Sequence, residues 1–167
     1  MQKQRRNSVS TSSNKKRLGN RSLFCYYISM LKILKTSDYI KDDPIRPTLS
    51  YAWRKSVGEI YYLGEHSPKA VCCVAKTHKI PVDTRDIALY KTGDFGIPYT
   101  IWSYEKGAGR ELIYALRDFA ISLGWERLVT LSPKTKMAHN FHISNGAFLL
   151  NENETSNNYE YKLLKAV

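Results

Sequence analysis

The feature that most constrains this chain is one amphipathic helix between two predicted strands. Four apolar residues, Leu112, Leu116, Phe119 and Leu123, recur at i, i+4, i+7 and i+11, which is the spacing of a single helix face. The pattern predicts a helix that ends at about Leu123, and Gly124 occupies the position of a left-handed C′ residue. A helix with one apolar stripe has to cover another layer, so we expect this unit to form the centre of the fold.

A glycine turn connects the first strand to this helix. The strand is predicted over 97–104, the turn follows at 107–109, and a second strand is predicted over 127–131, after the helix. Glycines at the start of a helix leave backbone N–H groups accessible, because no Cβ blocks their approach to a ligand. These amides and the helix dipole favour an anion such as a pyrophosphate. The alternative interpretation is that the glycines only end a strand and begin a helix.

The remaining segments predict an α+β protein with one strand–helix–strand crossover at its centre. Apolar spacing favours a short helix over 21–39, and the residues of 42–47 break the chain into a loop. The other expected elements are a hairpin over 56–77, a short helix starting near Asp83, a loop and helix over 133–144, and two final strands over 147–150 and 159–164, with a turn at 151–158.

Charge divides the chain into two parts. The 167 residues are enough for one domain with a sizeable core. The net charge is +11, but residues 1–22 hold seven Lys or Arg and no acid, which leaves +4 for residues 23–167. We therefore predict a disordered basic tail at 1–22 and one folded domain at 23–167. The tail can be interpreted as a nucleic-acid arm, as an organelle transit peptide or as a segment without function, and we favour the last because no aromatic residues interleave with its charges.

Cysteine use and hydropathy bear on the compartment. The three cysteines, Cys25, Cys72 and Cys73, form no C-x-x-C pair, and an odd number argues against a disulfide framework. The longest apolar run, 23–34, is too short to cross a bilayer. We expect a cytoplasmic protein without membrane contact, with organelle targeting by the tail left open.

Ser132 and His142 are the most informative polar pair. Ser132 follows a predicted strand directly, and His142 lies on the helix that comes next. Together they can form a proton shuttle, because imidazole titrates near neutrality and a hydroxyl both donates and accepts. Each residue can instead be purely structural. His139 and His142 lie at i, i+3, but no third ligand accompanies them, so we reject a metal site.

The glycine turn and its helix resemble the core of the GNAT acyl-CoA transferase superfamily, in which a Q/R-x-x-G-x-G/A turn cradles the pyrophosphate of coenzyme A. Gly107 and Gly109 fit the two glycine positions, and Tyr104 stands where the family has Gln or Arg. The resemblance implies a GNAT-like mixed, mostly antiparallel twisted sheet flanked by helices. The cofactor contacts that we expect on this basis are Tyr104, Gly107, Ala108, Gly109, Arg110 and Asn140.

Four short blocks are similar to the GNAT-like catalytic domain of malonyl-CoA decarboxylase, in the same order along the chain. They are the G-x-E-L of Gly109–Leu112, the L-S-P of Leu131–Pro133, the N-F-H-x-x-N-G-A of Asn140–Ala147 and the N-Y-x-Y of Asn158–Tyr161. This resemblance implies a catalytic pair of Ser132 and His142, with Glu111 and Tyr161 as further functional residues. The helical N-terminal domain of that family, and a long helical insertion between its L-S-P and N-F-H blocks, have no counterpart here.

Two chemistries fit such a site. The first is acyl transfer from acetyl-CoA or another acyl-CoA to a small-molecule or protein amine, with His142 or Glu111 as base and no metal. The second is decarboxylation of a malonyl thioester, in which Ser132 and His142 stabilise the enolate and deliver a proton to carbon. We favour transfer, because the missing helical parts would be expected to help enclose a decarboxylation site. A third hypothesis is a non-catalytic module that binds nucleic acid through the tail.

Overall fold

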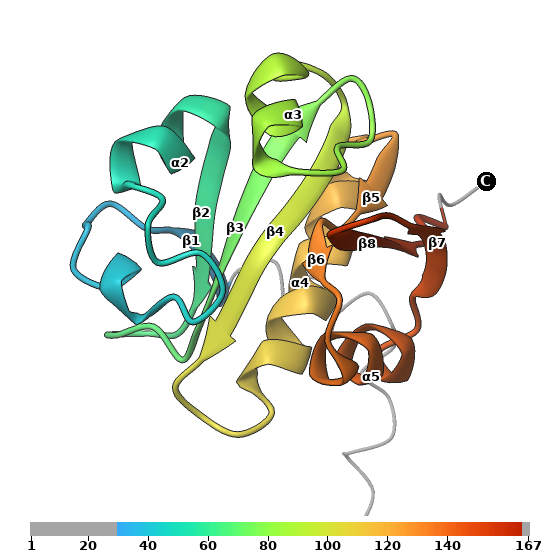
Figure 1. Ribbon diagram of the computed structural model, residues 1–167. Coiled ribbons are helices and arrows are strands. Elements are labelled where there is room, and N and C mark those ends of the chain that lie inside the picture. The colour runs from blue at the N-terminus through green and yellow to red at the C-terminus, as the bar shows by residue number, and fades with distance from the viewer. Residues whose placement is uncertain (1–29, 165–167) are drawn as a thin grey trace, which may run out of the picture.

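The computed structural model describes residues 30–164 (Figure 1). The predicted tail at 1–22 and the first part of the predicted helix at 21–39 lie outside the described residues. No helix within residues 30–164 is long and apolar enough to cross a membrane.

Eight strands form one sheet in the order β1-β2-β3-β4-β5-β8-β6, and β7 pairs with β8. The strands are β1 (Leu31–Ile33), β2 (Gly58–Leu63), β3 (Ala70–Thr77), β4 (Phe95–Ser103), β5 (Arg127–Val129), β6 (Ser132–Pro133), β7 (Phe148–Glu152) and β8 (Ser156–Tyr161). The helices are the 3-10 helix η1 (Ile40–Asp42) and the α-helices α2 (Tyr51–Val57), α3 (Thr84–Leu89), α4 (Ala108–Ser122) and α5 (Lys136–Ser144).

The predicted crossover is present at the centre of the sheet. Strands β4 and β5 form the parallel pair, with Phe95 opposite Arg127 and Gly96 opposite Leu128, and α4 connects them. The other pairs in the sheet are antiparallel. The fold is therefore the mixed, mostly antiparallel α+β architecture that was expected.

Helices cover both faces of the sheet. Helix α4 lies on one face and α2 and α3 lie on the other (Figure 1). The face under α4 is built around Leu112 and Leu116, which are fully buried as the apolar stripe predicted. The opposite face includes Val57 of α2 and Ile87 of α3. Gly124 has φ 70°, in agreement with the left-handed helix end expected there.

The two central strands separate after a short contact, and this separation positions the site. The last backbone bond between them runs from the Leu131 amide to the Pro98 carbonyl, at 2.9 Å. The chain then forms β6, which pairs with β8 rather than with β4. On its other side, β4 shifts register against β3, so that Tyr99 has no partner between Pro98 and Thr100. Such an irregularity bends a strand and redirects its side chains.

Several boundaries differ from the expectations. Residues 31–33 form a strand rather than part of a helix, because they pair with Tyr61–Leu63 at the edge of the sheet and this tertiary contact outweighs the local spacing. The turn predicted over 151–158 is shorter, since β7 and β8 continue to Glu152 and from Ser156. Helix α2 was not expected, although Ser50 caps it by accepting a hydrogen bond from the Trp53 amide.

Candidate active site

A cavity of about 340 Å³ lies where β4 and β5 separate. Its walls come from both faces of the sheet, because Gly109 and Ile113 belong to α4 on one face, whereas Pro44 and Ile45 belong to the loop on the other. The remaining lining residues are Pro98, Tyr99, Thr100, Ile101, Trp102, Ser103, Leu131, Ser132, Pro133, Thr135, Met137, Ala138, Phe141 and His142. The set is mostly apolar with a few polar groups, which is typical of small-molecule sites.

Ser132 and His142 meet at the wall of this cavity. Ser132 Oγ lies 3.0 Å from His142 Nε2, and the other ring nitrogen, Nδ1, lies 2.8 Å from the Tyr161 hydroxyl. Strand β8 supplies Tyr161, helix α5 supplies His142, and β6 supplies Ser132. The structure therefore brings together three of the four residues that were predicted to be catalytic.

Burial keeps the imidazole of His142 neutral. The residue is 5% exposed and stacks on Tyr159, with 4.9 Å between ring centroids and 24° between planes. Burial disfavours the cation and lowers the pKa of His142 to about 4. At pH 7 the ring thus has one N–H donor and one acceptor nitrogen, and it is a weaker base than an exposed histidine.

This low pKa predicts an acid-sensitive contribution to stability. The unfolded chain takes up a proton at His142 near pH 6.5, but the native protein does so only near pH 4. Between these values the unfolded state binds more protons, so stability falls as the pH falls, by about 3 kcal/mol in total. Between pH 7 and pH 4, we expect the free energy of unfolding, measured in urea, to fall by about 3 kcal/mol more in wild type than in the His142→Gln variant. Equal losses in both proteins would contradict a neutral, buried His142.

The glycine turn at the start of α4 has the backbone that an anion site requires. Gly107 adopts φ 83°, which favours glycine, and a Cβ there would contact nothing within 4 Å. The Ala108 amide already donates to the Glu105 carbonyl, at 3.2 Å. The Gly109 and Arg110 amides have no acceptor among residues 30–164. Of the amides at this turn, Ala108 is therefore already engaged, whereas Gly109, which also lines the cavity, and Arg110 can donate to a ligand.

The other predicted residues lie outside the cavity. Glu111 is exposed on the first turn of α4, Asn140 is exposed on α5, and Arg110 is exposed with its guanidinium 5.4 Å from the Tyr114 ring centroid. The Tyr104 hydroxyl donates to Asp42 Oδ2, at 2.7 Å, and accepts from Trp102 Nε1, at 3.0 Å. Glu111 therefore does not lie at the cavity, in contrast to Ser132 and His142.

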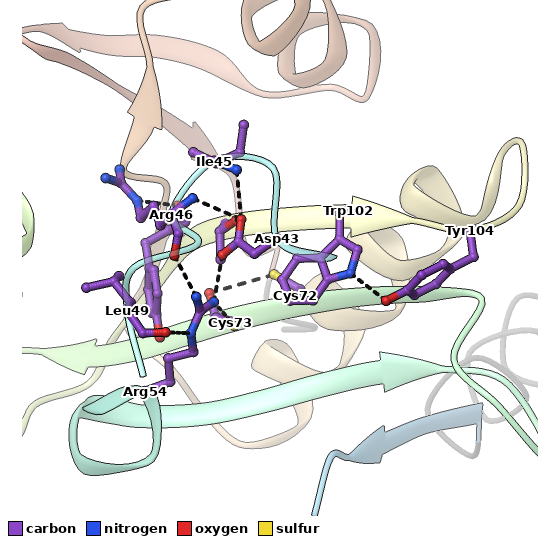
Figure 2. Close-up of polar contacts among 11 residues, drawn as sticks. Asp43, Ile45, Arg46, Leu49, Arg54, Cys72, Cys73, Trp102 and Tyr104 are labelled. Carbon is purple, nitrogen blue, oxygen red and sulfur yellow. Dashed lines mark hydrogen bonds and ion pairs between the residues drawn. The ribbon is translucent and has the colours of Figure 1, made fainter. Parts of the chain in front are cut away.

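Sequence reasoning missed a buried charged network on the face opposite α4 (Figure 2). Asp43 Oδ2 accepts from Arg54 Nη1 at 2.7 Å, and both side chains are fully buried. Asp43 Oδ1 accepts from the Ile45 and Arg46 amides and from the Thr100 hydroxyl. Burial alone would raise the pKa of Asp43, but these hydrogen bonds outweigh it and hold the pKa below the usual value.

Arg46 connects this network to the separating strands. Its Nε donates to the Tyr99 carbonyl of β4 at 3.0 Å, and its Nη2 donates to the Leu131 carbonyl at 3.2 Å. Leu131 directly precedes Ser132. The guanidinium therefore satisfies two backbone carbonyls, one on β4 and one directly before β6.

Metal ligands do not gather in the part of the chain that the structure describes. No group of three or more His, Cys, Asp or Glu side chains is placed there to hold an ion. His139 Nδ1 lies 3.1 Å from the Tyr159 hydroxyl, and His142 bonds Tyr161 and Ser132. The two histidines of α5 each have a tyrosine of β8 as partner.

Known structures share this fold. A Bacillus subtilis acetyltransferase solved in complex with CoA superposes with a TM-score of 0.54 and 14% identity, over 78% of this chain and 93% of that one. A protein of Desulfovibrio desulfuricans, assigned to the GNAT family of acetyltransferases, superposes with a TM-score of 0.50 and 12% identity, over 67% of this chain and 72% of that one. This chain has the GNAT fold. No family description and no curated protein matches its sequence.

The likeness confirms the architecture that the glycine turn and helix predicted. At 12% and 14% identity it concerns the fold and not the activity. These structures do not show the resemblance to malonyl-CoA decarboxylase.

Proposed function

We propose that this protein is an acyltransferase that uses acetyl-CoA or another acyl-CoA and transfers the acyl group to an amine. The observation that carries this proposal is the cavity at the separation of β4 and β5. It contacts α4 on one face and the loop at Pro44 and Ile45 on the other, and Ser132 and His142 lie in its wall. With walls from both faces, such a cavity would let two substrates approach from opposite sides and react in the middle.

The coenzyme would bind on the α4 face. The Gly109 and Arg110 amides would donate to the pyrophosphate at the positive end of a 15-residue helix, and the Arg110 side chain would add charge. From this turn the acyl chain would enter the cavity past Gly109 and Ile113, toward Ser132. The Tyr104 side chain is turned toward Asp42, so we assign its predicted coenzyme contact to the backbone of the turn instead.

The amine would enter from the loop face. Of the two predicted bases, only His142 lines the cavity, because Glu111 is exposed on α4, and His142 would act through its hydrogen bond to Ser132. Ser132 would act on the acyl carbonyl, where negative charge develops as the amine attacks. The acceptor is a small-molecule or protein amine, and the free thiols Cys72 and Cys73 are consistent with a reducing compartment such as the cytoplasm.

Release of free CoA from acetyl-CoA in the presence of an amine panel tests this proposal. The panel should include a polyamine, an aminoglycoside, free amino acids and peptides with free N-termini. Amine-dependent CoA release with mass-spectrometric detection of the acylated amine is the expected result. Tight binding of acetyl-CoA without any acylated product from such a panel would argue for a different reaction.

Decarboxylation of a malonyl thioester is the second candidate. The observation that favours it is the chain Ser132–His142–Tyr161, which has a neutral imidazole and no carboxylate, as suits delivery of a proton rather than its removal. This reaction needs no acceptor. Conversion of malonyl-CoA to acetyl-CoA in the absence of any amine would support it over transfer.

A further inference from the structure

We infer that Thr130 is a positioning residue that turns the Ser132 hydroxyl into a hydrogen-bond donor toward the acyl carbonyl in the cavity. The inference rests on the proposed function for the identity of the ligand. The arrangement of hydrogens behind it follows from the described residues alone.

Thr130 lies at the inner end of the Ser132 hydrogen-bond chain. It is fully buried, and its Oγ1 is 2.8 Å from Ser132 Oγ. The same oxygen accepts a hydrogen bond from the Tyr159 amide at 3.1 Å. The series of hydrogen bonds thus runs from Thr130 through Ser132 and His142 to Tyr161, at the opposite end.

The four groups hold one hydrogen more than their mutual bonds can use. The hydroxyls of Thr130, Ser132 and Tyr161 each carry one hydrogen, and the neutral imidazole of His142 carries another. Only three contacts connect the four groups in series. One hydrogen must therefore point away from the chain.

The position of that hydrogen depends on burial. Tyr161 is 1% exposed and Thr130 is fully buried, and neither hydroxyl has a further acceptor among residues 30–164. An unpaired hydrogen at either end would leave a buried donor unsatisfied, which is costly. Ser132 lies between the two ends and lines the cavity, where water or a ligand oxygen can accept.

Both ends of the chain are then satisfied by donating inward. The Tyr161 hydroxyl donates to His142 Nδ1, and Nε2–H donates to Ser132 Oγ. The contact between Thr130 and Ser132 joins two hydroxyls, so either can donate. Donation by Thr130 is the direction we infer, because its buried hydroxyl has no other acceptor among residues 30–164. Ser132 Oγ accepts twice and presents its own hydrogen to the cavity. A thioester carbonyl only accepts hydrogen bonds, so it is the complementary group.

The tautomer of His142 tests this arrangement without any substrate. We would record ¹⁵N NMR spectra of the full chain with labelled histidine at pH 7 and assign His142 by its loss in the His142→Gln variant. The expected result is a neutral ring protonated on Nε2. A ring protonated on Nδ1 would mean that Ser132 donates to His142 and not to the cavity, which would overturn the inference.

Substitution of Thr130 tests the positioning role. Thr130→Val keeps the shape and removes the hydroxyl, whereas Thr130→Ser keeps it. We expect Thr130→Val to lower kcat for acyl transfer about tenfold with an unchanged KM for acetyl-CoA, and Thr130→Ser to restore most of the rate. Wild-type kcat in a folded Thr130→Val protein would overturn the inference, and so would an equal loss in Thr130→Ser.

The two measurements separate this inference from the proposed function. A wild-type protein that neither binds nor turns over acetyl-CoA refutes the proposed function. In that case, a His142 ring protonated on Nδ1 would still overturn the inference, because Ser132 would then donate to His142.

Discussion

Ser132→Ala and His142→Ala should each lower kcat by roughly 10²- to 10⁴-fold, and the double variant should be little worse than either single one. The two side chains share one hydrogen bond of 3.0 Å at the cavity wall, so removal of either disables the same unit. The affinity for acetyl-CoA should survive in all three variants, because the glycine turn, at which we propose that the pyrophosphate binds, lies elsewhere. Steady-state rates together with calorimetric binding would measure both quantities.

His139→Ala provides the matched control. His139 lies on the same helix and also contacts a tyrosine of β8, but it does not line the cavity. We expect its kcat to remain close to that of wild type. If Ser132→Ala is as active as wild type, or if rate and folded fraction fall together in His142→Ala, the pair has only a structural role.

Asp43→Ala should destabilise the protein by about 3–5 kcal/mol, because it leaves the buried guanidinium of Arg54 without its counter-ion. The loss should be smaller in the double variant Asp43→Leu, Arg54→Met, which removes both charges together. Equilibrium urea unfolding at pH 7 would measure these differences.

Glu152→Ala is the comparison for an exposed pair. Glu152 lies 3.6 Å from Lys134 at the surface, and such pairs contribute less than about 1 kcal/mol. Similar losses for Asp43→Ala and Glu152→Ala would show that the network around Asp43 does not hold the loop to β4. That result would also contradict a stabilising role for Arg46 at the point where β4 and β5 separate.

Local signals made the central unit predictable. The apolar spacing of α4, Gly107 at its start and Gly124 at its end all lie within 18 residues of sequence, and each specifies its own backbone. The helix that begins after Asp83 was predictable for the same reason, since the Asp83 side chain caps it by accepting from the Asp86 amide at 2.9 Å.

Contacts between distant segments were not predictable in this way. Strand β1 exists because it pairs with β2, about thirty residues later, and its own spacing favoured a helix. The ion pair of Asp43 and Arg54 depends on how the loop folds back on β4, which no local pattern reports.

The candidate site was only partly visible in the sequence. Ser132 and His142 were found through a resemblance in short blocks, and Tyr161 joined them through the same blocks. The sequence contains a weaker indication that Thr130 belongs to the site. Thr130 lies two residues before Ser132, and this i, i+2 spacing places both side chains on one face of an extended chain. Its contact with the Tyr159 amide depends on strand pairing and had to come from the structure.

Calorimetry with CoA and acetyl-CoA on wild type, Gly107→Asp and Gly124→Asp tests the central claim most directly. Both glycines have positive φ, 83° and 70°, and open space where a Cβ would lie, so the two substitutions impose a similar backbone strain. Only Gly107 lies at the start of α4, where Asp would repel a pyrophosphate. We predict micromolar binding (on the order of 10⁻⁶ M) for wild type and Gly124→Asp, and no measurable binding for folded Gly107→Asp. Absence of binding in wild type, or equal affinity in all three proteins, would contradict the account.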